Sequence, residues 1–262
     1  MNLTFHKYHG TGNDFILVDD PNGEIRLTEK MVESLCNRRF GIGADGLIIM
    51  SHLQGYDFQM IYYNADGKVS SMCGNGGRCI TAFAKLLGRI DGEATFSAVD
   101  GSHRAVIAGV SPMIVKLQMN DVREIKSIDN LIYLHTGSPH VVQFVDDVAV
   151  LDVKEEGKKI RFSTPFKADG VNVNFVEKSG NQLIVRTYER GVEDETLSCG
   201  TGVVASAIAA FATNEIKAGK SEVAIRTKGG SLKVYFEKSG STFRDVWLEG
   251  EATFVYKGLI EA

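Results

Sequence analysis

Runs of β-branched and aromatic residues, bounded by Gly, Asp and Asn turns, recur along the chain and predict short β-strands. In the first half of the chain these runs cover 15–18, 46–50, 58–63, 94–99 and 114–119. In the second half they cover 141–145, 171–177, 183–188, 222–226, 232–236 and 244–249. The hydrophobic pattern therefore predicts a protein built mainly from strands.

Three segments have a helical pattern instead. Residues 28–39 combine a candidate N-cap at Thr28, an apolar stripe and a stop signal at Gly41. The other two predicted helices, 73–87 and 199–213, lie among the strands of each half. The second of them contains the run GVVASAIAAFAT, which is apolar nearly all round. A helix of this kind is buried on every side, as it would be inside a curved sheet.

An internal repeat relates the two halves. Cys73 and Cys199, which are 126 positions apart, each precede a Gly-x-Gly motif and a helix-compatible apolar run. Three further pairs of short motifs follow in the same order at similar offsets of 124, 127 and 129 positions: ADG at 44 and 168, VDD at 18 and 145, and the turns DGS at 100 and GGS at 229. The repeat predicts two α+β domains, each with a buried central helix.

Composition and charge narrow the class of protein. With 262 residues, 44% of them hydrophobic and 24% charged, the chain is globular rather than disordered or fibrous. Its net charge of −4 and lack of a basic block argue against nucleic acid as a partner. The longest apolar stretch, 202–212, is shorter than the roughly 20 residues that span a bilayer, and the beginning of the sequence lacks a signal-peptide core. We therefore expect a cytoplasmic protein without membrane contact.

The four cysteines are candidates for chemistry, because they are too few for a disulfide framework and form no C-x-x-C pair typical of zinc. Cys36 belongs to the apolar stripe of its helix, and Cys79 lies about 240° around the helix from Cys73, so both are interpreted as core residues. Cys73 and Cys199 stand at helix N-termini, where the backbone amides and the helix dipole favour a thiolate. For a single cysteine, packing as a small hydrophobic residue is the alternative interpretation.

Two thiols brought together from related domains suit one class of reaction. Inversion of a stereocentre removes a proton from one face of a carbon and returns a proton to the other face. Two helix N-termini could also stabilise the carboxylate of an amino acid whose α-proton is removed. The cysteine pair therefore indicates an amino-acid racemase or epimerase that needs no metal and no cofactor.

Polar residues beside the cysteines suggest how a substrate is bound. Asn64 precedes Cys73 by nine residues, as Arg190 precedes Cys199, so the two stand at equivalent strand ends. Arg190 could bind a carboxylate and Glu189 an ammonium group, although the pair could equally be an exposed strand end.

Other polar residues in these regions are candidates for neutral hydrogen bonds. Asn64 and Asn172 would add such bonds to the substrate. Asn13 and His140 stand at equivalent positions under the 127 offset, in the glycine-rich turns GTGND and TGSPH. His140 could instead be an ordinary turn or core residue.

Eight motifs in order along the whole chain resemble the diaminopimelate epimerase family. They are GTGNDF at Gly10, FGIGADG at Phe40, NADG at Asn64, MCGNGGRC at Met72, GSPHV at Gly137, YERG at Tyr188, CGTG at Cys199 and GEAT at Gly250. The resemblance implies an epimerase that works without pyridoxal phosphate, interconverts LL- and meso-diaminopimelate for lysine and peptidoglycan synthesis, and forms a homodimer.

The resemblance also implies a fold and a site. Two domains, 1–118 with 250–262 and 119–249, would each be a barrel-like sheet around a central helix, with the active site in the cleft between them and a last strand, 251–256, returning to the first domain. Cys73 and Cys199 would be the two bases. The implied substrate-binding groups are Asn13, Asn64, Asn172, Glu189, Arg190 and the amides of Gly74, Asn75, Gly200 and Thr201, with His140 and Ser138 as supporting residues.

Three departures from the family pattern concern the distal end of the substrate. Gly46 stands where many members carry Gln, Ser138 stands where Asn is common, and the segment between Arg190 and Cys199 is one residue longer.

One alternative function is a proline racemase or hydroxyproline epimerase, although MCGNG and the Glu189–Arg190 pair favour the diamino acid. The other is a binding protein or thiol–disulfide switch.

Overall fold

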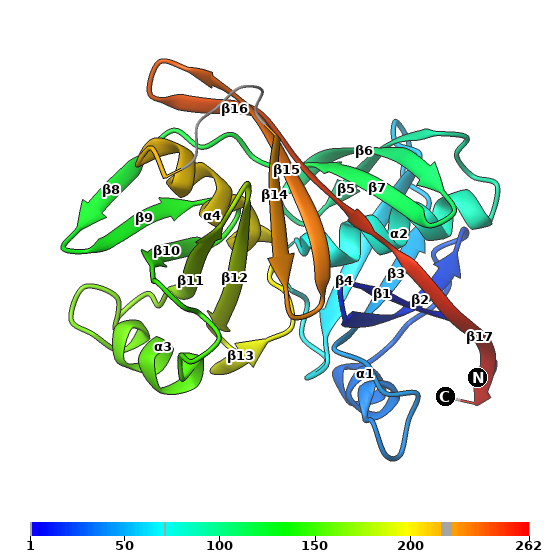
Figure 1. Cartoon of the computed structure of the whole chain (residues 1–262). Helices are drawn as coiled ribbons and strands as arrows, with labels where there is room; N and C mark the ends of the chain where they lie inside the picture. Colours follow the sequence, from blue (N-terminus) through cyan, green and yellow to red (C-terminus); the bar gives the residue numbers. More distant parts are fainter. Residues whose placement is uncertain (1, 71, 216–221, 262) are drawn as a thin grey trace. The chain divides into compact units, whose positions relative to one another are not determined.

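The computed structural model describes residues 2–70, 72–215 and 222–261 (Figure 1). It divides into two compact units. Unit 1 comprises Met1–Leu117 and Gly250–Ala262, and unit 2 comprises Gln118–Glu249. No helix within the described residues is both long and apolar enough to cross a bilayer.

Unit 1 is a mixed sheet with two helices, α1 (Glu29–Cys36) and α2 (Gly74–Leu86). β1 pairs antiparallel with β17 and β2, β2 runs parallel to β3, and β3 runs antiparallel to β4. β4 is parallel to β5, and β5, β6 and β7 follow as antiparallel neighbours. The strands are β1 (Asn2–Gly10), β2 (Asn13–Asp20), β3 (Gly46–Ser51), β4 (Phe58–Asn64), β5 (Glu93–Ala98), β6 (Gly101–Val110), β7 (Met113–Gln118) and β17 (Thr253–Glu261).

Unit 2 has the same kind of sheet and the helices α3 (Val153–Arg161) and α4 (Gly200–Ala212). β8, β9 and β10 are antiparallel neighbours, β10 is parallel to β11, and β11 is antiparallel to β12. β12 is parallel to β14, which is antiparallel to β15. The strands are β8 (Ile125–Ile128), β9 (Leu131–His135), β10 (Pro139–Phe144), β11 (Asn172–Ser179), β12 (Gln182–Glu189), β13 (Asp194–Thr196), β14 (Glu222–Thr227), β15 (Gly230–Ser239) and β16 (Thr242–Glu251).

The two units share one topology, which confirms the predicted repeat. In each unit a short helix, α1 or α3, connects the first pair of parallel strands, and α2 or α4 connects the second pair. The hairpins that follow turn at Gly101 and Gly230, the two turn positions that the sequence offset paired. Both glycines have positive φ, 122° and 147°, which disfavours a side chain there.

The central helix of each unit is enclosed by strands. α4 contacts β9, β10, β11, β12, β14 and β15, and α2 contacts β1, β2, β3, β4 and β6. Every residue from 74 to 84 in α2 is buried, and so are Gly200 and residues 202–210 of α4. The predicted α+β fold, with a curved sheet around a buried helix, is therefore confirmed for each unit.

A second apolar layer lies on the opposite face of each sheet. In unit 1, Ile16, Val18, Leu47 and Ile49 pack on the α1 side. In unit 2, Val141, Val173 and Phe175 pack with Val153 of α3. Strands buried on both faces are continuously apolar, which is why FILV in β2 and GLIIM in β3 stand out in the sequence.

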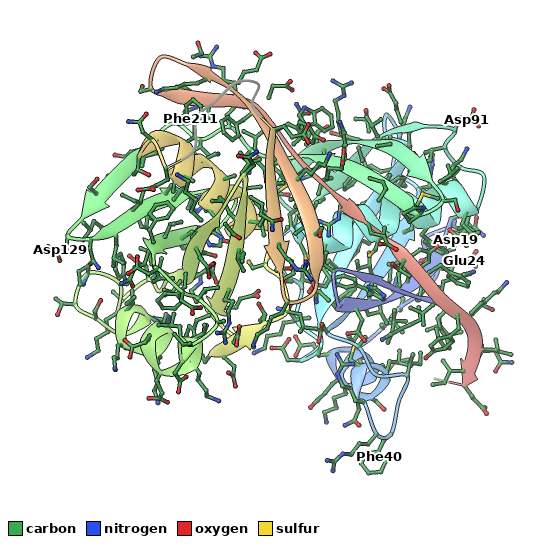
Figure 2. All side chains as sticks on the ribbon, in the orientation of Figure 1. Asp19, Glu24, Phe40, Asp91, Asp129 and Phe211 are labelled. Carbon is green, nitrogen blue, oxygen red and sulfur yellow. The ribbon has the colours of Figure 1, made fainter. Side chains whose placement is uncertain are left out.

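The first helix is shorter than predicted. Thr28 is its N-cap, as expected, but the helix ends at Cys36 rather than at residue 39. Asn37 has extended backbone angles, and its side-chain oxygen accepts hydrogen bonds from the amides of Arg39 and Phe40. This competing local bonding ends the helix and leads to Phe40, which projects from the loop into solvent (Figure 2).

Candidate active site

The cysteines of the repeat both lie at the start of a central helix. Cys73 is the N-cap of α2 and Cys199 is the N-cap of α4, and their backbone angles are nearly the same (φ −113°, ψ 121° and φ −111°, ψ 110°). Neither thiol makes the usual side-chain capping bond to its helix. The first-turn amides of a helix have no acceptor within that helix, so both helix starts offer N–H groups beside a thiol.

The glycines after each cysteine bring the helix close to the sheet. A Cβ at Gly76 would lie 3.0 Å from Ile48 Cδ1, and a Cβ at Gly202 would lie 2.3 Å from Asn174 Oδ1. The second glycine of each Cys-Gly-x-Gly motif is therefore needed for helix–sheet contact. The residue between the two glycines, Asn75 or Thr201, carries the polar side chain that contacts the network around the thiol.

Around Cys73 the polar side chains are held in one orientation. Asn13 Nδ2 donates to Asp45 Oδ2 at 2.7 Å, so its oxygen faces the helix, where it accepts from Asn75 Nδ2 at 3.2 Å and from Cys73 Sγ at 3.6 Å. Asn75 Oδ1 in turn accepts from Arg78 at 2.9 Å. The amides of Asn13 and Asn75 thus position each other and the thiol.

An ion-pair cluster holds Asp45, the residue to which Asn13 donates. Arg38 donates to both oxygens of Asp14, at 3.0 and 2.7 Å, and to Asp45 at 2.7 Å, and Lys7 also pairs with Asp14. Burial alone would raise the pKa of Asp14, but the hydrogen bonds from Arg38 and Lys7 hold it well below its ordinary value. Asp14 therefore remains charged at neutral pH.

Around Cys199 the corresponding network is built from hydroxyls and an imidazole. Thr201 Oγ1 lies 3.5 Å from Cys199 Sγ, 3.1 Å from Ser138 Oγ and 2.8 Å from His140 Nε2. Ser138 Oγ is also 2.9 Å from His140 Nε2. The Thr136 hydroxyl donates to the Thr201 carbonyl at 2.8 Å, which ties the helix start to the end of β9.

His140 is fully buried and neutral. Burial, together with smaller contributions from the neighbouring His135 and Arg190, lowers the pKa of its imidazole to about 3. Asn174 Nδ2 donates to the Val141 carbonyl at 2.9 Å, so the same NH₂ group faces His140 Nδ1 at 3.1 Å. His140 is thus a core residue, in agreement with the alternative interpretation. It also contacts Thr201.

The candidate zwitterion receptor lies at the end of β12. Glu189 is its last residue, and Arg190 follows as an exposed residue whose guanidinium donates to the Asp169 carbonyl at 2.8 Å. The Arg190 backbone amide donates to Asn172 Oδ1, while Asn172 Nδ2 donates to Ser138 Oγ and the Pro139 carbonyl. The side chain of Asn172 therefore joins the Cys199 network to the residue after β12.

Asn64 occupies the equivalent strand end in unit 1. It is the last residue of β4, it is exposed, and its backbone amide donates to the Lys68 carbonyl. The strand ends predicted to be equivalent do correspond, but the last residue of β12, which matches Asn64, is Glu189 rather than Arg190.

The strand register corrects one pairing inferred from the sequence. Phe15 pairs with Gly46 at the start of one parallel ladder, and His140 pairs with Asn172 at the start of the other. His140 is therefore equivalent to Phe15 rather than to Asn13. Asn13 corresponds to Ser138, and each of these two side chains contacts the helix residue two positions after the cysteine.

Two residues that position the site were not singled out from the sequence. Asn174 holds His140, and Arg78 holds Asn75. Both are fully buried polar residues, and both interrupt an apolar or small-residue pattern: VNVNF in β11 and GGRCITAF in α2. A polar residue within an otherwise apolar or small-residue segment was the sequence signal that could have identified both positions.

The chain matches a known protein family over most of its length. The family model described as "Diaminopimelate epimerase" matches residues 5–123 and 132–255, which is most of the chain. The chain belongs to the diaminopimelate epimerase family.

Two relatives of that name are similar over almost their whole length. The diaminopimelate epimerase of Flavobacterium psychrophilum is 49% identical over 263 residues, covering 98% of this chain and 100% of that protein. The diaminopimelate epimerase of Chlorobaculum tepidum is 41% identical over 257 residues, covering 96% and 98%.

Solved structures with the same fold extend beyond the diaminopimelate epimerase family. A phenazine biosynthesis protein of the PhzF family from Bacillus anthracis superposes with a TM-score of 0.78 at 14% identity, over 100% of both chains. A probable proline racemase from Agrobacterium radiobacter has a TM-score of 0.71 at 14% identity, over 99% of this chain and 93% of that one. At this identity the likeness concerns the fold alone.

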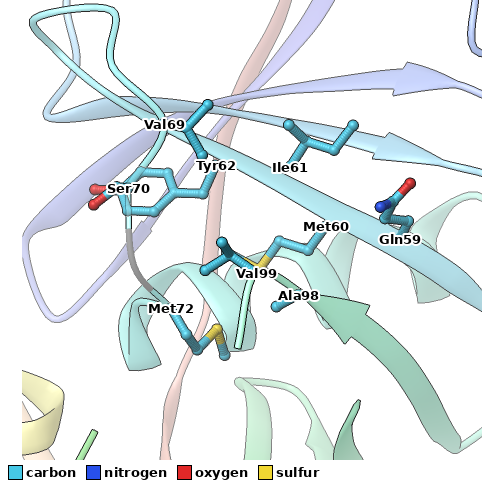
Figure 3. Close-up of a pocket in the computed structure, with 9 residues that line it drawn as sticks. All are labelled: Gln59, Met60, Ile61, Tyr62, Val69, Ser70, Met72, Ala98 and Val99. Carbon is cyan, nitrogen blue, oxygen red and sulfur yellow. The ribbon is translucent and has the colours of Figure 1, made fainter. Parts of the chain in front are cut away.

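Gly46, one of the departures from the family pattern, is enclosed by its own sheet. A Cβ there would lie 2.5 Å from both Tyr62 Cε2 and the Tyr63 carbonyl oxygen. Tyr62 lines a pocket together with Val69, Ser70 and other residues of unit 1 (Figure 3). The Tyr62 ring therefore fills the space that a longer side chain at position 46 would need.

We expect Gly46→Ala to lower the free energy of unfolding by about 1–3 kcal/mol, because the Tyr63 backbone cannot move away from the added methyl group. Gly92→Ala is the matched control, since a Cβ at Gly92 meets no atom within 4 Å. Urea unfolding of both variants checks this. Equal stability of the two would mean that the space beside Gly46 is not restrictive.

The longer segment before Cys199 is accommodated in a turn. Glu193 has a left-handed backbone conformation (φ 56°), and its carboxylate accepts from the Gly191 amide and the Tyr188 hydroxyl. β13 follows directly and pairs back onto β12. The residues of this segment therefore contact the end of β12, beside Glu189.

The described residues offer no obvious metal centre. Within 2–70, 72–215 and 222–261, no group of three or more His, Cys, Asp or Glu side chains is arranged to hold a metal ion.

Proposed function

We propose that the chain is a diaminopimelate epimerase, which inverts one α-carbon of diaminopimelate and so interconverts the LL and meso isomers. The observation that carries this proposal is the duplicated helix start, with Cys73 and Cys199 as N-caps in two units of the same topology. Membership of the diaminopimelate epimerase family supports the choice of substrate. The predicted domains, the role in lysine and peptidoglycan precursor synthesis and the cytoplasmic location belong to this proposal.

The proposed reaction exchanges protons between the two sulfurs and one carbon. One thiolate removes the α-proton and becomes a thiol, and the C–H electron pair passes into the carboxylate-stabilised carbanion. The other thiol delivers its proton to the opposite face and becomes the thiolate. Each turnover thus exchanges the protonation states of Cys73 and Cys199, and the next molecule of the opposite isomer restores them.

Backbone amides would stabilise the negative charge that develops during this reaction. The first-turn N–H groups at Gly74, Asn75, Gly200 and Thr201 lie at the positive ends of α2 and α4. Arg190 and Glu189 would bind the distal carboxylate and ammonium groups, and Asn64 would add hydrogen bonds. Asn13 and Asn172 are proposed to contact the substrate while their amides keep the bonds described above.

A direct assay separates this function from the nearest alternative. The purified protein, reduced and dialysed against EDTA, is incubated with LL-diaminopimelate and, separately, with L-proline and trans-4-hydroxy-L-proline. We expect chiral chromatography to show meso-diaminopimelate, with or without hydroxylamine, which inactivates pyridoxal phosphate. Inversion of a proline substrate without inversion of diaminopimelate would favour the proline racemase alternative, and sensitivity to hydroxylamine would contradict cofactor independence.

The homodimer implied by the family resemblance also belongs to this proposal. β17 carries four large apolar residues with much of their surface exposed, Phe254, Val255, Tyr256 and Leu259. Apolar side chains clustered on one strand are typical of a protein interface. We propose that this strand contributes to the dimer contact.

Leu259→Glu should shift the protein from dimer to monomer, because a charge would be buried in the contact without a partner. Light scattering after gel filtration measures the molar mass. Val110→Glu is the control, since Val110 in β6 is equally exposed (70% against 67%) but lies on another strand. If the Leu259→Glu variant is still a dimer, or if the Val110→Glu variant is a monomer, the dimer contact lies elsewhere.

A further inference from the structure

The hydroxyls and the imidazole beside Cys199 form a hydrogen-bond chain whose direction can be worked out from its ends. The Asn172 NH₂ group donates to the Pro139 carbonyl at 3.1 Å, so its nitrogen also donates to Ser138 Oγ at 3.2 Å. At the other end, the Asn174 NH₂ group donates to the Val141 carbonyl, so it faces His140 Nδ1 as a donor. Both amides are therefore fixed by backbone acceptors.

The tautomer of His140 follows from Asn174. Because His140 Nδ1 accepts a hydrogen bond and the ring is neutral, its single proton lies on Nε2. Nε2–H then donates to Thr201 Oγ1 at 2.8 Å. The titratable groups that act on this ring are His135 and Arg190, both basic, and they also favour the neutral form.

Among these side chains, one arrangement of the remaining protons gives both hydroxyl groups an acceptor. The Ser138 hydroxyl cannot donate to the protonated His140 Nε2, so it donates to Thr201 Oγ1 at 3.1 Å. Thr201 Oγ1 then accepts two hydrogen bonds, and its own proton must point to another acceptor. That acceptor is Cys199 Sγ at 3.5 Å.

We propose that Thr201 is a positioning residue whose hydroxyl proton is directed by Ser138 and His140 onto Cys199 Sγ, where it stabilises the thiolate. This role rests on the proposed function, in which Cys199 acts as a base. A donor aimed at sulfur favours the charged form of the thiol. The backbone amide of Thr201 could contact the substrate independently of this hydroxyl.

The described residues around Cys73 lack this arrangement, which confines the proposal to Cys199. The residue equivalent to Thr201 is Asn75, whose amide bonds to Arg78 and Asn13. Asn13 presents an oxygen to Cys73 Sγ, so Cys73 faces an acceptor, while the buried guanidinium of Arg78 acts on Cys73 through its charge. Cys73 therefore serves as an internal reference in the same protein.

The test measures the ionisation of each thiol in the free protein. Rates of alkylation by iodoacetamide are followed across pH, and quenched samples are mapped by peptide mass spectrometry, which yields an apparent pKa for Cys199 and for Cys73. Thr201→Val should raise the apparent pKa of Cys199 by about one unit, which is a tenfold smaller thiolate fraction below that pKa. The apparent pKa of Cys73 should not change.

Matched variants separate the hydroxyl from a general structural role. Thr201→Ser should restore the wild-type value for Cys199, and Ser138→Ala should shift it in the same direction as Thr201→Val, by less. Thr201→Ala serves if Thr201→Val does not fold. An unchanged Cys199 value without the hydroxyl, or an equal shift in Thr201→Ser, would overturn the proposal. Because no substrate is present, the outcome does not depend on whether the protein epimerises diaminopimelate.

Discussion

Replacing either Cys73 or Cys199 with alanine should reduce epimerisation of diaminopimelate at least a hundredfold under reducing conditions. Each direction of the reaction needs one sulfur to remove the proton and the other to return it, so neither cysteine can substitute for its partner. Loss of a positioned general base typically costs 10²- to 10⁴-fold in rate. Initial rates with both LL- and meso-diaminopimelate measure the effect.

Cys36→Ala provides the control for these variants. Cys36 packs in the apolar layer beside α1, and burial raises the pKa of its thiol to about 11, so it remains protonated at neutral pH. We expect this variant to lose some stability but to keep its turnover. If Cys73→Ala or Cys199→Ala keeps more than about a tenth of wild-type turnover, a loss under about 1.4 kcal/mol, the two-base mechanism is wrong.

Arg190→Lys should raise the KM for diaminopimelate at least tenfold. A lysine ammonium cannot reproduce the two parallel hydrogen bonds that a guanidinium makes to a carboxylate. Glu189→Gln should weaken binding in the same way, because it removes the charge that would pair with the distal ammonium. Steady-state kinetics with diaminopimelate, lysine and proline measure both effects.

Arg226→Lys is the matched control for this charge pair. Arg226 is an exposed residue of β14, a strand of the same unit, and its replacement should leave the KM unchanged. Lysine, which lacks the distal carboxylate, should be a poor substrate for every variant. Unchanged diaminopimelate kinetics in Arg190→Lys, or proline turnover as fast as that of diaminopimelate, would instead support the proline racemase alternative.

The repeat made much of the fold predictable. The motifs at Cys73 and Cys199 have strong local determinants, since small residues follow each cysteine and an apolar helix follows them. The buried parallel strands β2 and β3 contain continuous apolar runs and are also recognisable. From these elements, the sequence alone predicts that both cysteines lie at helix N-termini.

Elements with polar sequences were missed for physical reasons. α3 has the sequence VKEEGKKIR, in which only Val153 and Gly157 are buried, so it lacks an apolar stripe. Its equivalence to α1 in the repeat was the signal that could have revealed it. β1 was missed because His6 and Lys7 interrupt its pattern, although both are buried, with Lys7 paired to Asp14.

The candidate site was predictable in its residue types but not in its bonding. Asn13, Asn75 and Asn172 were expected at the substrate, yet their side-chain amides also bond to Asp45, Arg78 and Ser138. Partners of this kind depend on strand register, and a shift of one or two residues changes them. The same limit explains why Asn13 was paired with His140 rather than with Ser138.

The central claim is that two monoprotic bases act on opposite faces of one carbon, and solvent deuterium tests it most directly. LL-diaminopimelate is incubated with the enzyme in D₂O, and product and remaining substrate are analysed by mass spectrometry at low conversion. The account predicts one α-deuterium in each meso product molecule and protium retained in the recovered substrate, because the base on the substrate side returns the proton it removed. Deuterium appearing in the recovered substrate as fast as in the product, or meso product that retains its protium, would contradict it.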